Sequence, residues 1–393
     1  MNGRHEREVA IVGVGMTRLG NRERMGMKEL FAEALTEAFA DVEKGIDPAA
    51  INEVWVGSLK TGGSQLGNTA PLLCDMVHLP DVPAQSVENA CAGGAFAFRD
   101  GVMSIRSGMN DVVVVAGCEK MNDLTRERNR YWLGNSGDVE WERLAGVSFP
   151  GLYAMVALRH FHKYGTSREQ LCKIAVKNHK HGLRNPKAQL RFPIDYEKAL
   201  QAPYIAYPFT LFDVCPITDG AAVAILCRAD LAKEFTDTPI YVVGLGAASD
   251  AMALHDRADI TRFRAAELAA AQAYKEAGVT PANIDVAEVH DCFTIAELIT
   301  YEALGFCGFG EGGRLVDEKH TELGGRIPVN VSGGLKSKGH PIGATGLCQI
   351  YEIVHQLRGD VQEPERQVQG AEIGLAENAG GSVGSCAVTI LRR

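Results

Sequence analysis

The chain has 393 residues, a formal net charge of −9, 46% hydrophobic residues and 23% charged residues. This composition is typical of a globular protein with two or three domain-sized units, and the acidic balance excludes broad, non-specific nucleic acid binding. No apolar run is long enough to span a membrane and the N-terminus lacks a secretory signal, so we expect a cytoplasmic protein without membrane contact. The 10 cysteines include no C-x-x-C pair, which disfavours a metal site.

The first half of the chain alternates strands and helices. A glycine-containing apolar strand is predicted at 8–17, and an amphipathic helix at 27–45 follows it. A turn and a strand come next at 46–58. An extended segment, a glycine-rich turn and a helix lie within 83–108, and a strand at 219–230 closes this half.

The same order of segments recurs in the second half. It runs through a strand at 240–249, a helix at 264–279, a turn and strand at 280–292, a glycine-rich turn and helix within 328–359, and a last strand at 381–393. This match indicates an internal repeat. The alternation predicts an α/β fold with mainly parallel sheets and helices buried between them. We therefore divide the chain into one half of 1–118 and 219–238 and another of 239–393.

Residues 119–218 have no counterpart of equal length in the second half. We interpret this segment as an inserted loop domain over the functional site, since such insertions seldom build the core. Its aromatic side chains could form a ligand pocket or merely the core of the loops. They are Tyr131, Trp132, Trp141, Phe149 and Tyr153.

The stretch VENACAGGAFAF (87–98) places Cys91 between a predicted strand and a predicted helix. Backbone N–H groups and the dipole at a helix N-terminus favour the reactive thiolate, and the N–H of Cys91 could help to hold an oxyanion. From this segment alone, a buried packing cysteine is an equally good interpretation.

The stretch VNVSGGLKSKGHPIGATG (329–346) is more specific. Glycine turns flank His340, and Pro341 suits the first turn of a helix. The repeat equates this turn with the Cys91 turn, so pseudo-symmetry predicts that the two side chains meet. A histidine beside a cysteine is a recurrent activated-nucleophile pair. The alternative is a capping histidine on a structural loop.

Two further loops follow predicted strands. VHDCFT (289–294) places His290 and Cys292 at the C-terminal end of a strand, where α/β proteins bind ligands. A hydrogen-bonded surface pair is the alternative for these residues. AENAGGSVGS (376–385) is a glycine-rich turn whose N–H groups could line an oxyanion hole.

Together these motifs resemble the thiolase family over essentially the whole chain. GHPIGATG resembles the family's histidine motif, and the Cys91 segment resembles its nucleophile motif. HDCF resembles the version found in sterol-carrier-protein-2-type and archaeal acetoacetyl-CoA thiolases. The resemblance implies the thiolase fold, with two pseudo-symmetric βαβαβαββ halves in a five-layered α-β-α-β-α core. It also implies homodimers or tetramers.

One position departs from the common thiolase pattern. Many thiolases carry a second catalytic cysteine before the last glycine turn, where this chain has Asn378. In HDCF-type relatives the cysteine of that motif supplies the missing acid or base. The resemblance therefore favours Cys292 for this role over Cys386, which lies within a strand pattern and is expected to be packed.

The resemblance implies CoA-dependent cleavage, or Claisen-type synthesis, of a 3-oxoacyl-CoA. Cys91 would form an acyl-enzyme, with His340 as its base. The N–H groups of Cys91 and Gly380 would form one oxyanion hole, and His290 and His340 would stabilise the enolate oxygen. Cys292 would exchange the proton on the α carbon. Coenzyme A would be a co-substrate, with no tightly bound cofactor and no metal.

The same resemblance extends to binding residues and partners. Ser332 and Gly333 match a family loop that lies along the pantetheine arm. The insertion offers a cationic run for the phosphates of coenzyme A, although such runs are also typical of a solvated helix face. It comprises Arg168, Lys173, Lys177, His179, Lys180, His181, Arg184, Lys187 and Arg191. A small zinc-ribbon/OB-fold accessory subunit accompanies many HDCF-type relatives.

Several alternatives stay open at this point. The substrate could be acetoacetyl-CoA or a bulkier 3-oxoacyl-CoA such as benzoylsuccinyl-CoA. A ketoacyl synthase or hydroxymethylglutaryl-CoA synthase would share the fold, but the histidine motif together with HDCF argues against both. A non-catalytic acyl-CoA-binding or lipid-transfer subunit is the alternative from a different class.

Overall fold

The computed structural model describes residues 8–63, 65–79 and 81–393. The strands are β1 (Val9–Met16), β2 (Glu53–Gly57), β3 (Ala84–Val87), β4 (Val112–Glu119), β5 (Tyr204–Ala206), β6 (Phe209–Thr210), β7 (Gly220–Arg228), β8 (Ile240–Ser249), β9 (Val286–Glu288), β10 (Ile373–Gly380) and β11 (Ser385–Arg392). Within the described ranges, no helix is long and apolar enough to cross a membrane.

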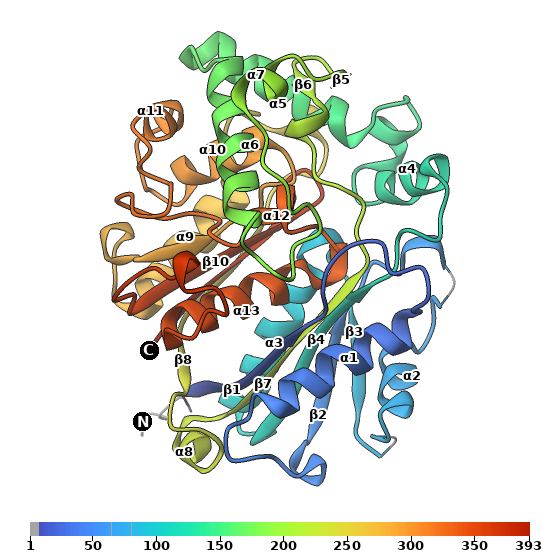
Figure 1. Ribbon diagram of the computed structural model, residues 1–393. Coiled ribbons are helices and arrows are strands. Elements are labelled where there is room, and N and C mark those ends of the chain that lie inside the picture. The colour runs from blue at the N-terminus through green and yellow to red at the C-terminus, as the bar shows by residue number, and fades with distance from the viewer. Residues whose placement is uncertain (1–7, 64, 80) are drawn as a thin grey trace.

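The helices alternate with these strands (Figure 1). They are α1 (Met27–Ala40), α2 (Thr69–Met76), α3 (Gly93–Ser107), α4 (Arg126–Gly134), α5 (Phe149–Tyr164), α6 (Arg168–Gly182), α7 (Tyr196–Leu200), α8 (Ala232–Phe235), α9 (Arg264–Ala277), α10 (Thr294–Ala303), α11 (Gly312–Asp317), α12 (Gly334–Ser337) and α13 (Thr345–Arg358).

The internal repeat is visible in the order of the strands, β3-β2-β4-β7-β1-β8-β11-β10-β9. In the first half β2 is parallel to β3 and β4, and β7 is antiparallel to β4 and β1. In the second half β9 is parallel to β10, and β11 is antiparallel to β10 and β8. A parallel bridge between Ala287 and Val329 stands where the third strand of this half is expected. Both halves therefore have one topology, and the antiparallel pairing of β1 with β8 joins them into a continuous sheet.

The layers form around two central helices. α3 and α13 contact each other between the two halves of the sheet, while α1 covers β1 and β7, and α9 covers β8 and β11 (Figure 1). Three clusters of buried apolar side chains fill the spaces between these layers. The predicted five-layered thiolase fold is thus the observed one.

Close contact between the central helices depends on glycine. A Cβ on Gly94 would lie 2.7 Å from the carbonyl oxygen of Gly343, and one on Gly346 would lie 2.4 Å from the backbone nitrogen of Ala95. Both distances are too short for a real side chain, so these glycines let the two backbones meet. As a result, the N-terminal ends of α3 and α13, where Cys91 and His340 were predicted, come together.

The segment between β4 and β7 lies over the end of the sheet that is next to the N-termini of α3 and α13 (Figure 1). It carries α4 to α7 and the β5–β6 hairpin. The division of the chain at 118/119, 218/219 and 238/239 stays a prediction.

Candidate active site

Cys91 occupies a short helical turn, Ala90–Ala92, directly before α3. The residue before it, Ala90, has a φ of 50°, a conformation that non-glycine residues rarely adopt. This turn redirects the chain from β3 into α3 and leaves Cys91 half-buried on the wall of a cavity of about 590 Å³. The sulfur can therefore meet a ligand.

The thiol of Cys91 is not an ionised one in the resting site. Burial raises its pKa to about 12, the nearby Cys215 thiol adds to this rise, and hydrogen bonds from the backbone of Gly381 and of Cys91 itself oppose it. Desolvation therefore outweighs the N–H groups of the helix N-terminus, on which the sequence-based expectation of a thiolate rests. Ionisation must accompany the reaction.

His340 is held by two hydroxyl groups. Its backbone N–H donates to Thr218 Oγ1 at 2.9 Å, and its Nδ1 lies 2.7 Å from Thr345 Oγ1. The Thr345 hydroxyl donates its single proton to the carbonyl oxygen of Pro341 at 3.0 Å. It must therefore accept from Nδ1–H, which leaves Nε2 with a free lone pair. Burial lowers the pKa of His340 to about 3, so the ring is a neutral proton acceptor.

His290 has the opposite arrangement. The side-chain amide nitrogen of Asn378 donates to its Nδ1 at 3.0 Å, so the ring proton lies on Nε2. Nε2 is buried and has no hydrogen-bond partner among the described residues. Burial, together with the neighbouring His340 ring, lowers the pKa of His290 well below its usual value, so this ring is also neutral. An unsatisfied buried N–H is well suited to binding an oxyanion.

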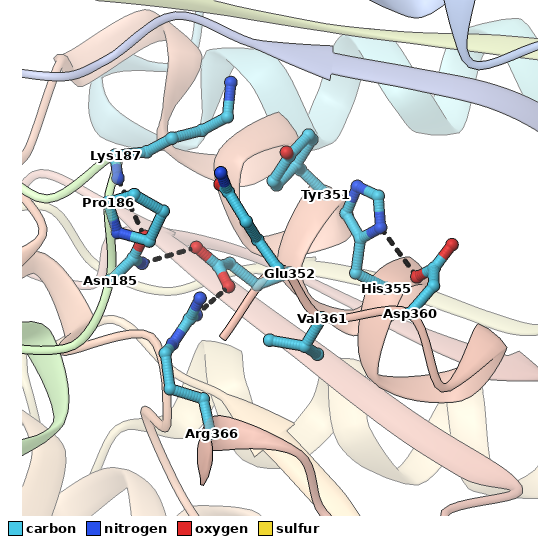
Figure 2. Close-up of a pocket in the computed structure, with 10 residues that line it drawn as sticks. Asn185, Pro186, Lys187, Tyr351, Glu352, His355, Asp360, Val361 and Arg366 are labelled. Carbon is cyan, nitrogen blue, oxygen red and sulfur yellow. Dashed lines mark hydrogen bonds and ion pairs between the residues drawn. The ribbon is translucent and has the colours of Figure 1, made fainter. Parts of the chain in front are cut away.

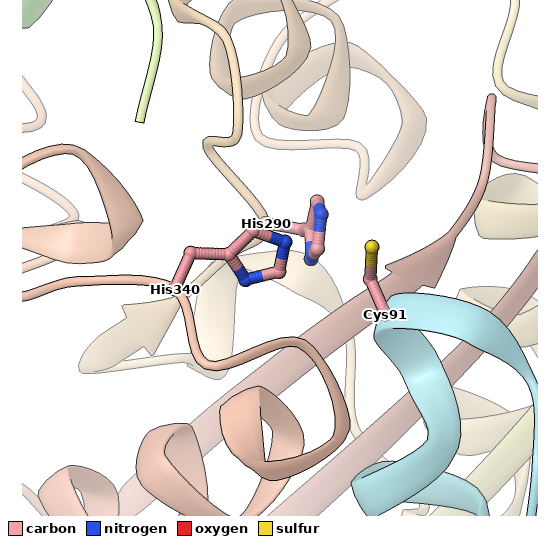
Figure 3. A group of neighbouring side chains, drawn as sticks. All are labelled: Cys91, His290 and His340. Carbon is pink, nitrogen blue, oxygen red and sulfur yellow. The ribbon is translucent and has the colours of Figure 1, made fainter. Parts of the chain in front are cut away.

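These three side chains converge (Figure 3). The sulfur of Cys91, one ring nitrogen of His290 and one of His340 all lie within 4.8 Å of one another. The two rings are nearly perpendicular, at 86°, with centroids 5.1 Å apart. One thiol, one proton acceptor and one proton donor thus face a common point. The same atoms are ligand types of zinc, and a bound zinc ion would occupy the thiol.

Of the two cysteines compared above, one lines the cavity. Cys292 is 6% exposed, lines the cavity with Cys91 and His340, and is hydrogen-bonded to the side chain of Tyr153. Burial raises its pKa well above the usual value, so it is a thiol. Cys386 is fully buried in β11 and donates to Glu377 Oε1 at 3.2 Å, away from the described lining of the cavity.

Comparison with known proteins agrees with this geometry. The chain matches the family "Thiolase, N-terminal domain" over residues 9–197 and "Thiolase C-terminal domain-like" over residues 246–393. It is 44% identical to an acetyl-CoA acetyltransferase of Methanothermobacter thermautotrophicus, with 98% of this chain and 100% of the relative aligned.

The chain belongs to the thiolase family. It is also 35% identical to the benzoylsuccinyl-CoA thiolase subunit BbsB of Thauera aromatica, over 93% of this chain and 92% of that subunit. The solved structure "Ltp2-ChsH2(DUF35) aldolase" has the same fold, with a TM-score of 0.86, 24% identity and 98% of each chain covered. This thiolase is an acyltransferase that acts on thioesters of coenzyme A.

Besides His290, three residues expected at the thiolase site are not among the described residues that line its cavity. Ser332 is fully buried and its hydroxyl donates to Glu288, while Gly333 packs against Gly182 of α6 at a φ of 102°. The contact of these two residues with the pantetheine arm stays a prediction. Gly380 ends β10, and it is the next residue, Gly381, that lines the cavity and hydrogen-bonds to the thiol of Cys91. The role of Gly380 in an oxyanion hole stays a prediction.

The insertion supplies much of the cavity wall, although with partly different residues from those expected. Phe149 and Tyr153 line it, whereas Tyr131 and Trp141 are exposed. Several lining residues were not predicted from the sequence, because most of them lie outside its recognisable motifs and Phe293, inside the HDCF motif, has no chemical group that marks it as functional. They include Arg126, Arg130, Cys215, Ile217 and Phe293.

Most side chains of the cationic run in the insertion form ion pairs with carboxylates or are buried. Five members form ion pairs, namely Arg168 with Asp213, Lys173 with Asp317, Lys177 with Glu297, Lys180 with Glu322, and Lys187 with Glu37. His179 and His181 are buried, and burial lowers the pKa of each. None of the run is in the described lining of the catalytic cavity, so its proposed contact with coenzyme A has no support here.

A second, much smaller cavity of about 50 Å³ lies between the segment 185–187 and the C-terminal part of α13 (Figure 2). Several of its polar groups bond to one another. Asn185 donates to Glu352 at 2.8 Å, Glu352 pairs with Arg366, and His355 pairs with Asp360. We interpret this network as a structural link between the insertion and α13.

Proposed function

We propose that this thiolase forms or cleaves the bond between the α and β carbons of a 3-oxoacyl-CoA through an acyl-enzyme on Cys91. The observation that carries the proposal is the convergence of the Cys91 sulfur and one nitrogen each of His290 and His340 within 4.8 Å, with Cys91 and His340 on the wall of one cavity. A carrier or lipid-transfer subunit would need no such arrangement of a nucleophile, an acceptor and a donor.

In the cleavage direction, Cys91 attacks the β carbonyl carbon of the substrate. The thiol proton moves to Nε2 of His340 as the new C–S bond forms. This coupling is required because both groups are neutral in the resting site. Backbone N–H groups of Cys91 and of the Gly380–Gly381 turn face the developing oxyanion and stabilise it.

The carbon–carbon bond then breaks. Its electrons pass to the α carbon and its thioester, forming an enolate whose oxygen accepts a hydrogen bond from Nε2–H of His290. Cys292 gives its thiol proton to the α carbon, and acyl-CoA leaves. The high pKa of the Cys292 thiol suits this role, because the proton is present when the enolate forms.

Coenzyme A completes the cycle. Its thiol returns a proton to the Cys292 thiolate, and its sulfur attacks the acyl group on Cys91. Cys91 leaves as a thiolate and takes back the proton held by His340, which restores every group. Synthesis is the reverse of these steps, and none of them requires a metal or a redox cofactor.

We propose two candidate substrates. Acetoacetyl-CoA is favoured by the relative named as an acetyl-CoA acetyltransferase, and a bulkier 3-oxoacyl-CoA by the relative named as a benzoylsuccinyl-CoA thiolase subunit. The apolar lining from Phe149, Tyr153, Ile205 and Phe293 offers room for an acyl group larger than acetyl.

We further propose a cytoplasmic homodimer or tetramer that works with a small zinc-ribbon/OB-fold accessory subunit. Two comparisons support a partner, since one relative is named as a subunit and one solved structure is titled as an assembly with a second component.

A direct assay tests the proposed function. CoA-dependent cleavage of acetoacetyl-CoA and of a series of bulkier 3-oxoacyl-CoA esters should be measured with the wild-type chain and Cys91→Ser. We expect turnover of at least one ester by the wild type and none by the variant. Absence of cleavage and synthesis with every ester, or equal turnover by Cys91→Ser, would contradict the proposal.

A further inference from the structure

The charge of the catalytic cavity differs from that of the whole chain. The protein has a formal net charge of −9, yet none of the described residues that line this cavity is an aspartate or a glutamate. The charged side chains in the lining are two arginines, Arg126 and Arg130, both on α4. The cavity is therefore locally positive in an acidic protein, which favours an anionic ligand.

The two arginines share one face of α4. They are four residues apart, a spacing that places side chains next to each other on a helix. Both are exposed; Arg126 interacts electrostatically with the neighbouring Glu127, and neither guanidinium forms a close ion pair within the described part of the chain. The basic run expected to bind phosphate is mostly paired instead, so Arg126 and Arg130 are the cations that face this cavity with free hydrogen-bonding capacity.

α4 leads from the catalytic centre outward. Beyond its C-terminal end, the carbonyl oxygen of Ser136 lies 2.5 Å from where a Cβ on Gly381 would be, so this end abuts the turn that hydrogen-bonds to Cys91. At about 1.5 Å per residue, Arg130 lies about 5 Å and Arg126 about 10 Å further along the helix than Leu133, another lining residue. The arginines are thus positioned for a group joined to the reacting thioester by a chain of several atoms.

We propose that Arg126 and Arg130 form an anion subsite of the catalytic cavity and bind a carboxylate or phosphate group of the substrate. This proposal rests on the proposed function. Guanidinium groups recognise both kinds of oxyanion through paired N–H donors. The group has two sources in an acyl-CoA: a carboxylate at the far end of the acyl chain, or the phosphates of coenzyme A itself.

Binding of four unreactive thioethers distinguishes an acyl carboxylate from the phosphates of coenzyme A. S-butyl and S-(3-carboxypropyl) coenzyme A differ only in the carboxylate, and the matching pantetheine thioethers lack the phosphates of coenzyme A. Binding to the wild type and to Arg126→Gln/Arg130→Gln is measured by calorimetry, with Arg128→Gln as the control. Arg128 is an exposed arginine of the same helix that is not among the described lining residues. Melting curves verify that all three proteins are folded.

We expect the double variant to lose about tenfold or more in affinity for one class of probe, with Arg128→Gln unchanged. Loss confined to the carboxypropyl probes, with or without phosphates, assigns the subsite to an acyl carboxylate. Loss for both coenzyme A probes, and for neither pantetheine probe, assigns it to phosphate. Unchanged affinity for all four probes overturns the proposal. Because the probes do not react, these results are independent of turnover, which tests the proposed function separately.

Discussion

Asn378 illustrates how one residue sets the chemistry of its neighbour. The sequence resemblance places it where common thiolases carry a second catalytic cysteine, and its amide donates to Nδ1 of His290. That contact places the ring proton on Nε2, which is buried and has no hydrogen-bond partner among the described residues, in a ring that lies beside Cys91 and His340 (Figure 3). Asn378 thus positions His290 through this hydrogen bond.

Asn378→Asp should reverse this hydrogen bond. A carboxylate can only accept, so neutral His290 would carry its proton on Nδ1 and lose the Nε2–H donor. We expect kcat near pH 8 to fall about 100-fold, the usual cost of removing one oxyanion donor. The carboxylate also raises the pKa of His290, so imidazolium forms and restores Nε2–H as the pH falls.

The measurement is the ratio of variant to wild-type kcat from pH 8 down to pH 5.5. It should rise toward low pH for Asn378→Asp and stay flat for Asn378→Leu, which removes the contact without adding charge. A flat ratio for Asn378→Asp, or wild-type activity, would show that the amide does not position His290.

The two candidate cysteines give a second comparison at this scale. Cys292→Ala should abolish carbon–carbon bond cleavage yet allow Cys91 to be acylated by acyl-CoA, because acylation does not use the Cys292 proton. Cys386→Ala should retain near-normal kcat but lower the free energy of unfolding by about 1 kcal/mol, since a buried group hydrogen-bonded to Glu377 is lost. Turnover and urea unfolding are measured for both, and an active Cys292→Ala beside an inactive Cys386→Ala would reverse the assignment.

The sequence predicts which residues react, but it does not predict their protonation states. Cys91, His290, Cys292 and His340 each follow a motif or the end of a predicted strand, and all but His290 line the cavity together. Their pKa values depend on burial by distant segments, which no local pattern contains. Arg130 lies on a loop helix without a motif, so only the fold shows that it faces the cavity.

At the scale of elements, the close packing of α3 and α13 determines whether Cys91 meets His340. Gly346→Ala adds a methyl group 2.4 Å from the Ala95 nitrogen and 2.7 Å from Asn378 Oδ1, so the helices must separate. We expect about 1–3 kcal/mol of destabilisation and slower acylation of Cys91. Gly151→Ala in α5 is the control, because its methyl group would meet no atom closer than 3.5 Å.

Thermal melting and the rate of acylation test this prediction. Gly151→Ala should match or exceed the wild-type melting temperature, because alanine favours a helix over glycine. Wild-type acylation by Gly346→Ala would show that the contact between the helices does not set the distance between Cys91 and His340.

The internal repeat predicted most helices and strands correctly, because the hydrophobic periodicity of each segment depends only on residues close together in the sequence. The third strand of the second half is the exception, since near Val329 the structure has only a bridge to Ala287. The segment 328–333 turns there into α12 instead of extending, as the φ of 55° at Asn330 shows. Such turns depend on side-chain contacts with α6 and β9, which sequence periodicity does not contain.

At the scale of the whole molecule, the proposed assembly predicts a mass. A complex purified gently from its native host should contain an even number of 42.3 kDa chains together with a small additional chain. Native mass spectrometry measures this directly. A fully active complex whose mass is a multiple of 42.3 kDa alone would rule out the accessory subunit as a requirement.

The central claim is that Cys91 carries the acyl group, and trapping the acyl-enzyme tests it most directly. Wild type, Cys91→Ser and Cys292→Ala are each mixed with acetyl-CoA, quenched in acid and digested, and the acylated peptide is identified by mass spectrometry. We expect one acetyl group on the peptide containing Cys91 in the wild type and in Cys292→Ala, and none in Cys91→Ser. An acetyl group on Cys292 or Cys215, or one that persists in Cys91→Ser, would contradict the account.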